Sequence, residues 1–430
     1  MKKIFWIIPI FLLFACQNED FSTTQELDSD KSQYELTSTQ AQGILEKFIS
    51  ENPDLKLTTR TAQTLKIKEV SKKYHGEINT RSNQTSEKIA MYNYEINNDK
   101  NRGFAIVCAD KRFPRVIAFS TKGTLDELKN SDNEVLANYL NNIEDYVAIL
   151  VSYRDKLPDL NNKYNAGFPY EEMIDVQYSW TTDSTKESIV YLKESITWSQ
   201  SAPYNNMFEF APGTNERYTV GCSNIATINI MAYYHYPKNY DWENLTMYPT
   251  ILEEYDPEEV VLEAAKLCKY VSEVSNSTSN PSTGTTSTTL AGAKAGFTAL
   301  GYKYTQVDSF SMTAIKKSLD NCYPVYMAAG DKNNPSNSTG HAFVVRGYWN
   351  TEINVEESLY NGDLAISLGI NWGNMGGFGD GWYLVEIGDL GLDFVGLNPI
   401  VLTDQGPAFS NQDWSRAVKL LTDIRPDNMD

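Results

Sequence analysis

Between residues 38 and 155, short strand-like apolar runs lie close to apolar residues at helical spacing, and together these patterns limit this part of the chain to a fold that mixes helices and strands. Shorter apolar runs bounded by polar turns predict strands at residues 89–96, 104–107 and 116–119, and residues 39–50 predict a helix. A second, longer helix is predicted from a repeat with spacings of 4, 3, 4 and 3, made by Leu136, Leu140, Ile143, Val147 and Leu150. We therefore expect residues 38–155 to form a compact α+β module.

The rest of the chain differs in composition and in hydrophobic pattern. Residues 156–195 are mixed and polar, and we interpret them as a junction between two folded parts. Residues 196–430 are rich in Gly and Trp beyond Tyr348 and contain an alternating apolar strand near residues 364–370, which predicts a second domain with its own sheet. Within it, Ser, Thr, Gly and Pro dominate Ser275–Thr289, which predicts a surface loop.

Composition argues against several classes of function. Because 37 Lys and Arg residues face 56 Asp and Glu residues, the net charge is −19, and no nucleic-acid partner is expected since phosphate binding needs clustered positive charge. The sequence contains no C-x-x-C and no H-E-x-x-H motif, so we expect no metal and no organic cofactor. With only 3 His and 5 Cys residues, thiol or imidazole chemistry has few candidates.

The first 16 residues resemble the signal peptide of a bacterial lipoprotein. Lys2 and Lys3 precede an apolar run, Ile4–Phe14, which is too short to span a bilayer and is followed by Ala15 and Cys16. In a lipobox Cys16 is the lipid attachment site, and residues 17–37 would form a polar tether. The resemblance implies a protein anchored by lipid to the outer membrane or cell surface, or released from it after processing. An ordinary secretory signal is the alternative.

Cys222 lies where a helix is expected to begin. The apolar residues after it have helical spacing, and the stretch ends at Pro237. The positive end of a helix favours the thiolate, which is the nucleophilic form of Cys, and Gly221 would allow close approach of the backbone. A buried core thiol is the alternative for a lone Cys.

Two further segments carry groups that could act with this thiol. His341 is expected at the start of a strand, where it could reach across a cleft and serve as a general base. Asn371 and Trp372 follow another strand; the Asn could accept from the imidazole and the Trp could shield that contact from water. A structural His and an ordinary Gly-rich hairpin are the alternatives. His235 is excluded, because a regular helix would place it about 20 Å from Cys222.

The order Cys222, His341, Asn371 is the order of papain-like cysteine proteases, and the closer resemblance is to the streptopain family. Ile230-Met231 follow Cys222 at the family's spacing, and Trp198-Ser199-Gln200 resemble the opening of its catalytic domain. Gly103–Val107 resembles a strand of its inhibitory pro-domain. The resemblance therefore implies a papain-like catalytic domain over residues 196–430, with a helical half carrying Cys222 and an antiparallel β half carrying His341. It also implies a small α+β pro-domain over residues 38–155.

By the same resemblance, Cys222 is the nucleophile, His341 is its base, and Asn371 and Trp372 support the His. Gln200 would add a side-chain N–H to an oxyanion hole. The sequence would thus encode a cysteine endopeptidase made as a zymogen, acting on protein or peptide substrates and inhibited by its own pro-domain, which cleavage within residues 156–195 would release.

This sequence departs from the family at two places. Asn374 and Met375 replace and extend a Trp-Gly-Gly sequence, and Ser223-Asn224 replace a small apolar pair after Cys222. Two other classes of function therefore stay open: a catalytically silent papain-like domain used for binding or adhesion, and a related Cys-His amidase or transglutaminase.

Overall fold

The computed structural model describes residues 34–52, 65–75, 88–97, 102–154, 185–193, 195–330, 340–353, 363–387, 390–391, 400–403, 406–409 and 417–429. The predicted lipobox with Cys16, and most of the predicted tether and junction, lie outside the described residues. Within them, no helix is both long and apolar enough to cross a membrane.

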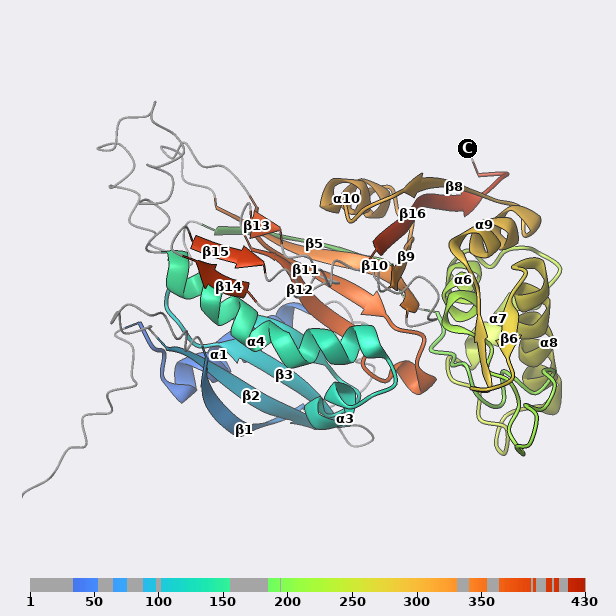
Figure 1. The fold of residues 1–430 in the computed structure, drawn as a ribbon, viewed down its shortest axis with the longest axis horizontal. Helices are drawn as coiled ribbons and strands as arrows, with labels where there is room; N and C mark the ends of the chain where they lie inside the picture. Colours follow the sequence, from blue (N-terminus) through green and yellow to red (C-terminus); the bar gives the residue numbers. More distant parts are fainter. Residues whose placement is uncertain are drawn as a thin grey trace, which may run out of the picture. The chain divides into compact units, whose positions relative to one another are not determined.

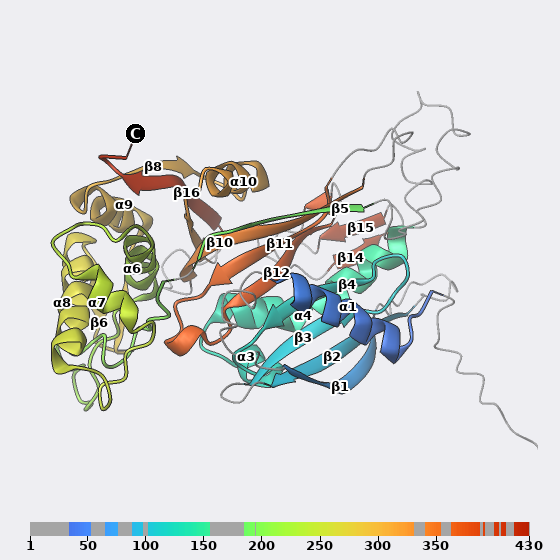
Figure 2. The same ribbon diagram turned by 180° about the vertical axis from the view of Figure 1, so that it is seen from behind.

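Residues 34–154 form the expected α+β module, which we call the pro-part. The strands are β1 (Lys66–His75), β2 (Ile89–Asn97), β3 (Arg102–Cys108) and β4 (Arg115–Ser120), and the helices are α1 (Ser38–Glu51), α3 (Leu125–Lys129) and α4 (Glu134–Arg154). The strands pair in sequence order, all antiparallel. Helices α4 and α1 cover opposite faces of these strands (Figures 1 and 2).

The helical half of the second part contains the helix that begins at Cys222. Its helices are α6 (Cys222–Tyr234), α7 (Trp242–Met247), α8 (Glu258–Val274) and α9 (Leu290–Ala299). The predicted surface loop at Ser275–Thr289 is instead largely a β-hairpin, made by β6 (Thr278–Asn280) and β7 (Thr285–Ser287). The hairpin lies largely at the surface, as expected, but the expectation of a loop was wrong, because composition alone does not reveal that the two Thr-rich ends can pair.

The β half follows in the chain. Its elements are β8 (Tyr302–Val307), α10 (Met312–Asp320), β9 (Val325–Gly330), β10 (Gly340–Ile353), β11 (Asp363–Asn371), β12 (Gly381–Ile387), β13 (Leu390–Gly391), β14 (Ile400–Thr403), β15 (Gly406–Phe409) and β16 (Ala417–Pro426). β14 and β15 form a separate two-stranded sheet. The resulting division into a helical half and an antiparallel β half agrees with the expected α+β class.

Among the described residues, one sheet of 12 strands joins the pro-part to the β half. Ten strands follow the order β1-β2-β3-β4-β12-β11-β10-β9-β16-β8, while β13 pairs with β12 and β5 pairs with β10. The junction between the two parts is β4 against β12, where Ser120, Phe119 and Ala118 pair with Gly381, Trp382 and Tyr383. One hydrophobic cluster also contains residues of both parts, such as Leu136 and Tyr139 with Leu368 and Tyr383. The pro-part therefore shares both a sheet and a core with the β half.

The end of the predicted junction is itself part of the sheet. Strand β5 (Thr185–Tyr191) pairs antiparallel with β10 from Gly347 to Ile353, and the Leu192 N–H donates to the Arg346 carbonyl at 2.7 Å. Residues 185–192 therefore belong structurally to the β half.

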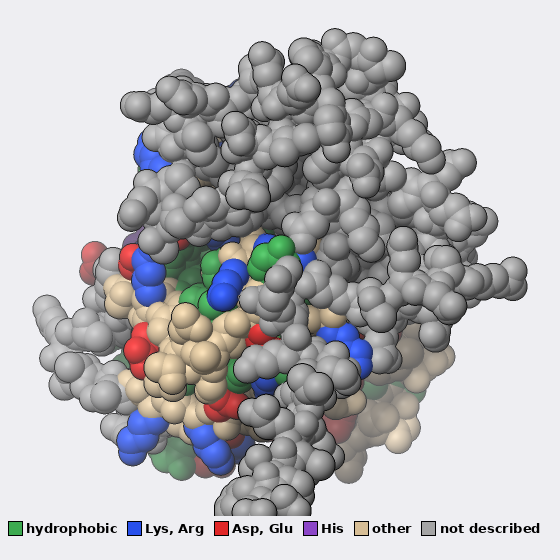
Figure 3. Space-filling model, turned by 90° about the vertical axis from the view of Figure 1, so that its left-hand side faces the viewer, with side chains coloured by type: hydrophobic (Ala, Val, Ile, Leu, Met, Phe, Trp, Pro, Cys, Tyr) green, Lys and Arg blue, Asp and Glu red, His purple; other side chains and the backbone are tan. Residues whose placement is uncertain are grey.

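On the face drawn in Figure 3, the described Lys and Arg side chains are interspersed with Asp and Glu.

Candidate active site

Cys222 is the first residue of α6, as the sequence predicted. The residue before it, Gly221, caps the helix with φ 92° and ψ 133°, a conformation that side chains rarely allow. A Cβ atom at Gly221 would lie 2.8 Å from the Thr286 carbonyl oxygen of β7. Only Gly fits here, and the close approach brings the β6–β7 hairpin against the start of α6.

His341 lies opposite Cys222 on β10, which confirms that it starts a strand. The two side chains are hydrogen-bonded to each other, and the N–H of Ala342 donates to Cys222 Sγ at 3.4 Å. The Nε2 atom of the buried His341 ring lies 2.7 Å from the Trp372 carbonyl oxygen. Because that carbonyl can only accept, Nε2 carries a proton and Nδ1 is left to face the thiol.

The charges of this pair are shifted toward thiolate and imidazolium. Burial opposes both ions, but the negative charge of Cys222 and the hydrogen bonds to Cys222 and Trp372 raise the pKa of His341 above its ordinary value. For the thiol, burial is likewise outweighed by the charge and hydrogen bond of His341 and by the N–H groups of Ala342 and Ser223, so the pKa of Cys222 lies below its ordinary value. Cys222 is partly exposed, so this thiolate is open to a substrate.

Aromatic rings surround the His341 imidazole. The Phe343 ring is stacked at 6.3 Å between centroids, and the Trp372 ring lies at 6.1 Å and packs on Phe343 at 4.6 Å. Trp372 is fully buried and meets Tyr383 edge-on at 5.6 Å. The Trp therefore acts on His341 in two ways: its carbonyl orients the ring, and its indole helps to exclude water.

Asn371 lies next to this contact and fixes the turn that carries the Trp372 carbonyl. Its Oδ1 accepts from the Gly373 N–H at 2.8 Å and from Asn229 Nδ2 at 3.1 Å, and its own Nδ2 donates to the Ile196 carbonyl at 3.4 Å. On the other side, the Trp372 N–H donates to Asp380 Oδ1 at 2.7 Å. The imidazole partner is thus a backbone carbonyl held by two neighbouring side chains.

The backbone of Gln200 lies beside the segment that leads into α6, and its carbonyl accepts from the Val220 N–H at 2.9 Å. The structure therefore brings Cys222, His341, Trp372 and Asn371 together. The Gln200 backbone lies against Val220, which is two residues before Cys222 in the chain.

The departure at Ser223-Asn224 has a structural explanation that sequence reasoning missed. Ser223 Oγ lies 2.8 Å from the hydroxyl of Tyr326 on β9, in a buried contact between the two halves. Asn224 Nδ2 donates to the Val220 carbonyl at 2.7 Å and to Ser277 Oγ at 3.0 Å. The available signal was the placement of two polar residues in the first turn of an otherwise apolar helix.

The other His and Cys residues lie elsewhere. His235 caps the far end of α6 and stacks on Trp242, which confirms its exclusion, and His75 belongs to the pro-part. Cys108 and Cys268 are buried, and burial raises the pKa of both thiols. Cys322 is exposed because it lies in the turn after α10. In the part of the chain that the structure describes, no three His, Cys, Asp or Glu residues form a group suited to a metal ion.

The pro-part contacts the turn that follows Trp372. Lys122 Nζ donates to the Gly376 carbonyl, the Gly379 N–H donates to the Lys122 carbonyl at 2.9 Å, and Ser120 Oγ donates to the Asp380 carbonyl at 2.8 Å. The β4 end of the pro-part is thereby linked to the residues that orient His341.

Comparison with known families matches both parts of the chain. Residues 33–147 match the Spi protease inhibitor family, and residues 198–240 and 238–383 match the Peptidase C10 family. The first match covers the pro-part up to residue 147. The second covers Gln200, Cys222, His341, Asn371 and Trp372.

Individual relatives share only about a quarter of their residues with this chain over the aligned regions. Streptopain of Streptococcus pyogenes is 26% identical over 200 residues, which cover 44% of this chain and 41% of streptopain. The thiol protease/hemagglutinin PrtT of Porphyromonas gingivalis is 27% identical over 149 residues, covering 34% of this chain and 15% of that protein. The chain thus spans about two fifths or less of the length of these curated relatives. A Prevotella intermedia prointerpain A fragment aligns with a TM-score of 0.44 at 18% identity, over 82% of this chain and 98% of the fragment.

Proposed function

Because the chain belongs to the Peptidase C10 family of cysteine-type peptidases and carries a Spi-type segment ahead of the catalytic part, we propose that it is the zymogen of a cysteine endopeptidase. Cys222 is the nucleophile and His341 is its proton partner. The observation that carries this proposal is the hydrogen-bonded Cys222–His341 pair at the start of α6, with the thiol pKa lowered and the imidazole pKa raised.

In the acylation step, the Cys222 thiolate attacks the carbonyl carbon of a peptide bond. The carbonyl oxygen takes the negative charge of the tetrahedral intermediate, His341 gives its Nδ1 proton to the leaving amine, and a thioester remains. The Trp372 carbonyl supports this role, because it holds the ring by Nε2 throughout.

In the deacylation step, neutral His341 takes a proton from water, the hydroxide attacks the thioester, and the thiolate is restored as the acid product leaves. The Cys222 N–H and the Gln200 side chain supply the oxyanion hole in both steps. One such donor typically contributes about 2.7–4 kcal/mol to lowering the barrier.

The pro-part acts as an intramolecular inhibitor, held by the β4–β12 pairing and by the Lys122 contact with Gly376. Activation requires a cut in the connection between the two parts. Since β5 pairs with β10, we place this cut ahead of Thr185, in the earlier portion of the predicted 156–195 junction.

Self-activation is tested by incubating the purified full chain beside a Cys222→Ala variant and mapping the new N-terminus by mass spectrometry. Processing of the native chain alone is expected. Equal processing of both chains would show that another protease makes the cut.

Hydrolysis itself is tested by labelling with a thiol-directed epoxide and by peptide turnover. We expect stoichiometric labelling of Cys222 that is lost in His341→Ala, and release of free peptide acids. Absence of labelling would favour the silent binding domain, whereas transfer of the acyl group to an added amine in preference to water would favour the transglutaminase class.

We further propose that Cys16 carries a lipid that anchors the protein at the outer membrane or cell surface. Incorporation of labelled palmitate should disappear in Cys16→Ala. Equal incorporation in both chains would contradict the anchor.

A further inference from the structure

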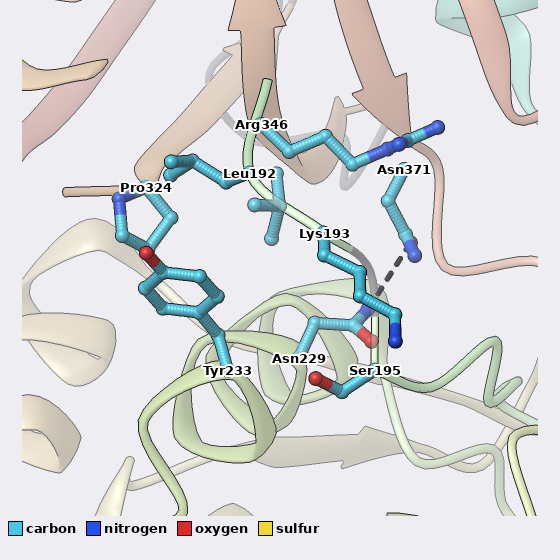
Figure 4. Close-up of a pocket in the computed structure, with 9 residues that line it drawn as sticks. Leu192, Lys193, Ser195, Asn229, Tyr233, Pro324, Arg346 and Asn371 are labelled. Atoms are coloured by element: carbon cyan, nitrogen blue, oxygen red, sulfur yellow. Dashed lines mark hydrogen bonds between the residues drawn. The ribbon is translucent and has the colours of Figure 1, made fainter. Parts of the chain in front are cut away.

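Asn229 is a buried amide in the middle of the nucleophile helix. It lies seven residues, about two turns, after Cys222 and is only 9% exposed. Burying an amide in an apolar helix is costly unless its polar atoms find partners. Asn229 Nδ2 donates to Asn371 Oδ1 at 3.1 Å, a buried bond between the two halves of the catalytic part (Figure 4).

That bond reaches the turn that orients His341. Asn371 Oδ1 also accepts from the Gly373 N–H at 2.8 Å, so one oxygen receives hydrogen bonds from α6 and from the turn. Between Asn371 and Gly373 lies Trp372, whose carbonyl is 2.7 Å from His341 Nε2. Asn229 therefore ties the helix that carries the nucleophile to the carbonyl that holds its base.

Asn371 is also held by the Gly373 N–H and by the Ile196 carbonyl, and the bond from Asn229 connects it to α6. A small cavity of about 30 Å³ lies next to both side chains and is lined also by Lys193, Ser195 and Tyr233 (Figure 4). Beside this space, the hydrogen bond from Asn229 ties the Asn371 side chain to α6.

We propose that Asn229 is a positioning residue for the Cys222–His341 pair, acting through Asn371 and the Trp372 carbonyl. This inference rests on the proposed function. Without the Asn229 donor, Asn371 keeps its bonds to Gly373 and Ile196 but loses its tie to α6. The turn is then held less firmly relative to the helix, and His341 spends less time aligned with Cys222. The direct consequence is a smaller thiolate fraction at neutral pH.

The test measures alkylation of Cys222 by iodoacetamide in the full-length chain between pH 5 and 10, by peptide mapping. The exposed Cys322 of the same molecule provides the reference thiol. In Asn229→Ala, we expect the Cys222-to-Cys322 rate ratio at pH 6 to fall about tenfold and the midpoint of Cys222 labelling to rise by about one pH unit. Asn229→Asp keeps the volume but turns an acceptor toward Asn371 Oδ1, and it should lose at least as much.

The matched control is Thr227→Val. Thr227 is fully buried on the same helix, but its Oγ1 donates only locally, to the Ser223 carbonyl at 3.0 Å. Its labelling profile should match that of the native chain. Since Asn229 acts through Asn371, the double variant with Asn371→Ala should lose no more than Asn371→Ala alone.

Three results would overturn the inference: an Asn229→Ala profile equal to that of Thr227→Val, Asn229→Asp behaving like the native chain, or losses that multiply in the double variant. A native ratio near one at pH 6 would be a different failure, because it would refute the activated thiol of the proposed function itself.

Discussion

Replacing Gly221 by Ala should damage both stability and catalysis, by amounts that follow from the geometry. At φ 92° a side chain stores about 1–3 kcal/mol of backbone strain. In addition, the new Cβ would lie 2.8 Å from the Thr286 carbonyl oxygen, and since this atom is backbone, the β6–β7 hairpin or the Gly221 peptide must move. We expect a total loss of about 2–4 kcal/mol in the free energy of unfolding, or roughly 4–16 °C in the melting temperature of the catalytic part.

Movement of the Gly221 peptide also redirects the Cys222 N–H, which the proposed mechanism uses as an oxyanion donor. Loss of one such donor lowers kcat about 10²–10³-fold. Differential scanning calorimetry of the full chain and peptide hydrolysis by the processed enzyme measure the two effects. Near-normal KM is expected, because the donor acts on the transition state more than on the bound substrate.

The control is Gly213→Ala. Gly213 also has a positive φ, 74°, but a Cβ there would meet no atom within 4 Å. It should therefore show the backbone strain without the contact, and activity should be retained. If Gly221→Ala and Gly213→Ala lost equal stability and both kept full activity, the argument from the hairpin contact would be refuted.

Three other predictions follow from the described contacts. Because His341 holds the pKa of Cys222 below its ordinary value, the thiolate should persist to a lower pH than that of an ordinary Cys. In His341→Ala, where burial remains, labelling of Cys222 should require more alkaline pH. Lys122→Met removes the charged donor to the Gly376 carbonyl, at a cost of about 1.5–3 kcal/mol, so inhibition by the pro-part should weaken roughly 10–100-fold in assays of the unprocessed chain. Burial opposes the charged form of His75, but a hydrogen bond to Asp145 and the nearby Glu144 carboxylate raise its pKa to about 9. Its contribution to stability should therefore be complete below pH 6.5 and vanish as pH rises through 9, a dependence that thermal unfolding of His75→Gln should lack.

Each of these has a result that would contradict it. Unchanged labelling midpoints in His341→Ala would mean that the helix end and backbone N–H groups alone activate the thiol. Equal inhibition in Lys122→Met and in Lys47→Met, a change at an exposed position of α1, would mean that the main-chain pairing alone holds the pro-part. Parallel pH profiles for the native chain and His75→Gln would assign the pH dependence to other groups.

Most elements of the pro-part could be predicted because each has its own hydrophobic period, whereas the short helix α3 and the strand β1, which has no buried residue, were missed. The predicted helix at residues 39–50 is α1, and the three predicted strands are β2, β3 and β4. The start of α6 at Cys222 and the strand position of His341 could be predicted for the same reason. Spacing along the chain records which face of an element is buried.

The pairing of β4 with β12 could not be predicted, since it joins residues about 260 positions apart through main-chain groups that every residue possesses. The role of the Trp372 carbonyl was hidden for the same reason: side-chain chemistry pointed to the Asn371 amide, whereas the atom nearest His341 Nε2 is a backbone oxygen. The Asn229–Asn371 hydrogen bond could not be predicted either, because it joins two amide side chains 142 positions apart and neither lies in a motif that points to the other.

The core shared between the pro-part and the β half has a consequence for what happens after the chain is cut. Tyr139 of α4 donates to the Leu384 carbonyl of β12 at 3.0 Å, and Phe48 of α1 stacks on Trp349 of β10 at 4.4 Å between ring centroids. None of these contacts depends on a continuous chain. Cleavage would therefore first produce a nicked complex. In the intact chain the pro-part is present at an effective concentration that is typically about millimolar; after the cut, its actual concentration in solution determines how much stays bound. Dilution, or digestion of the pro-part within the complex, would then decide when the enzyme becomes active.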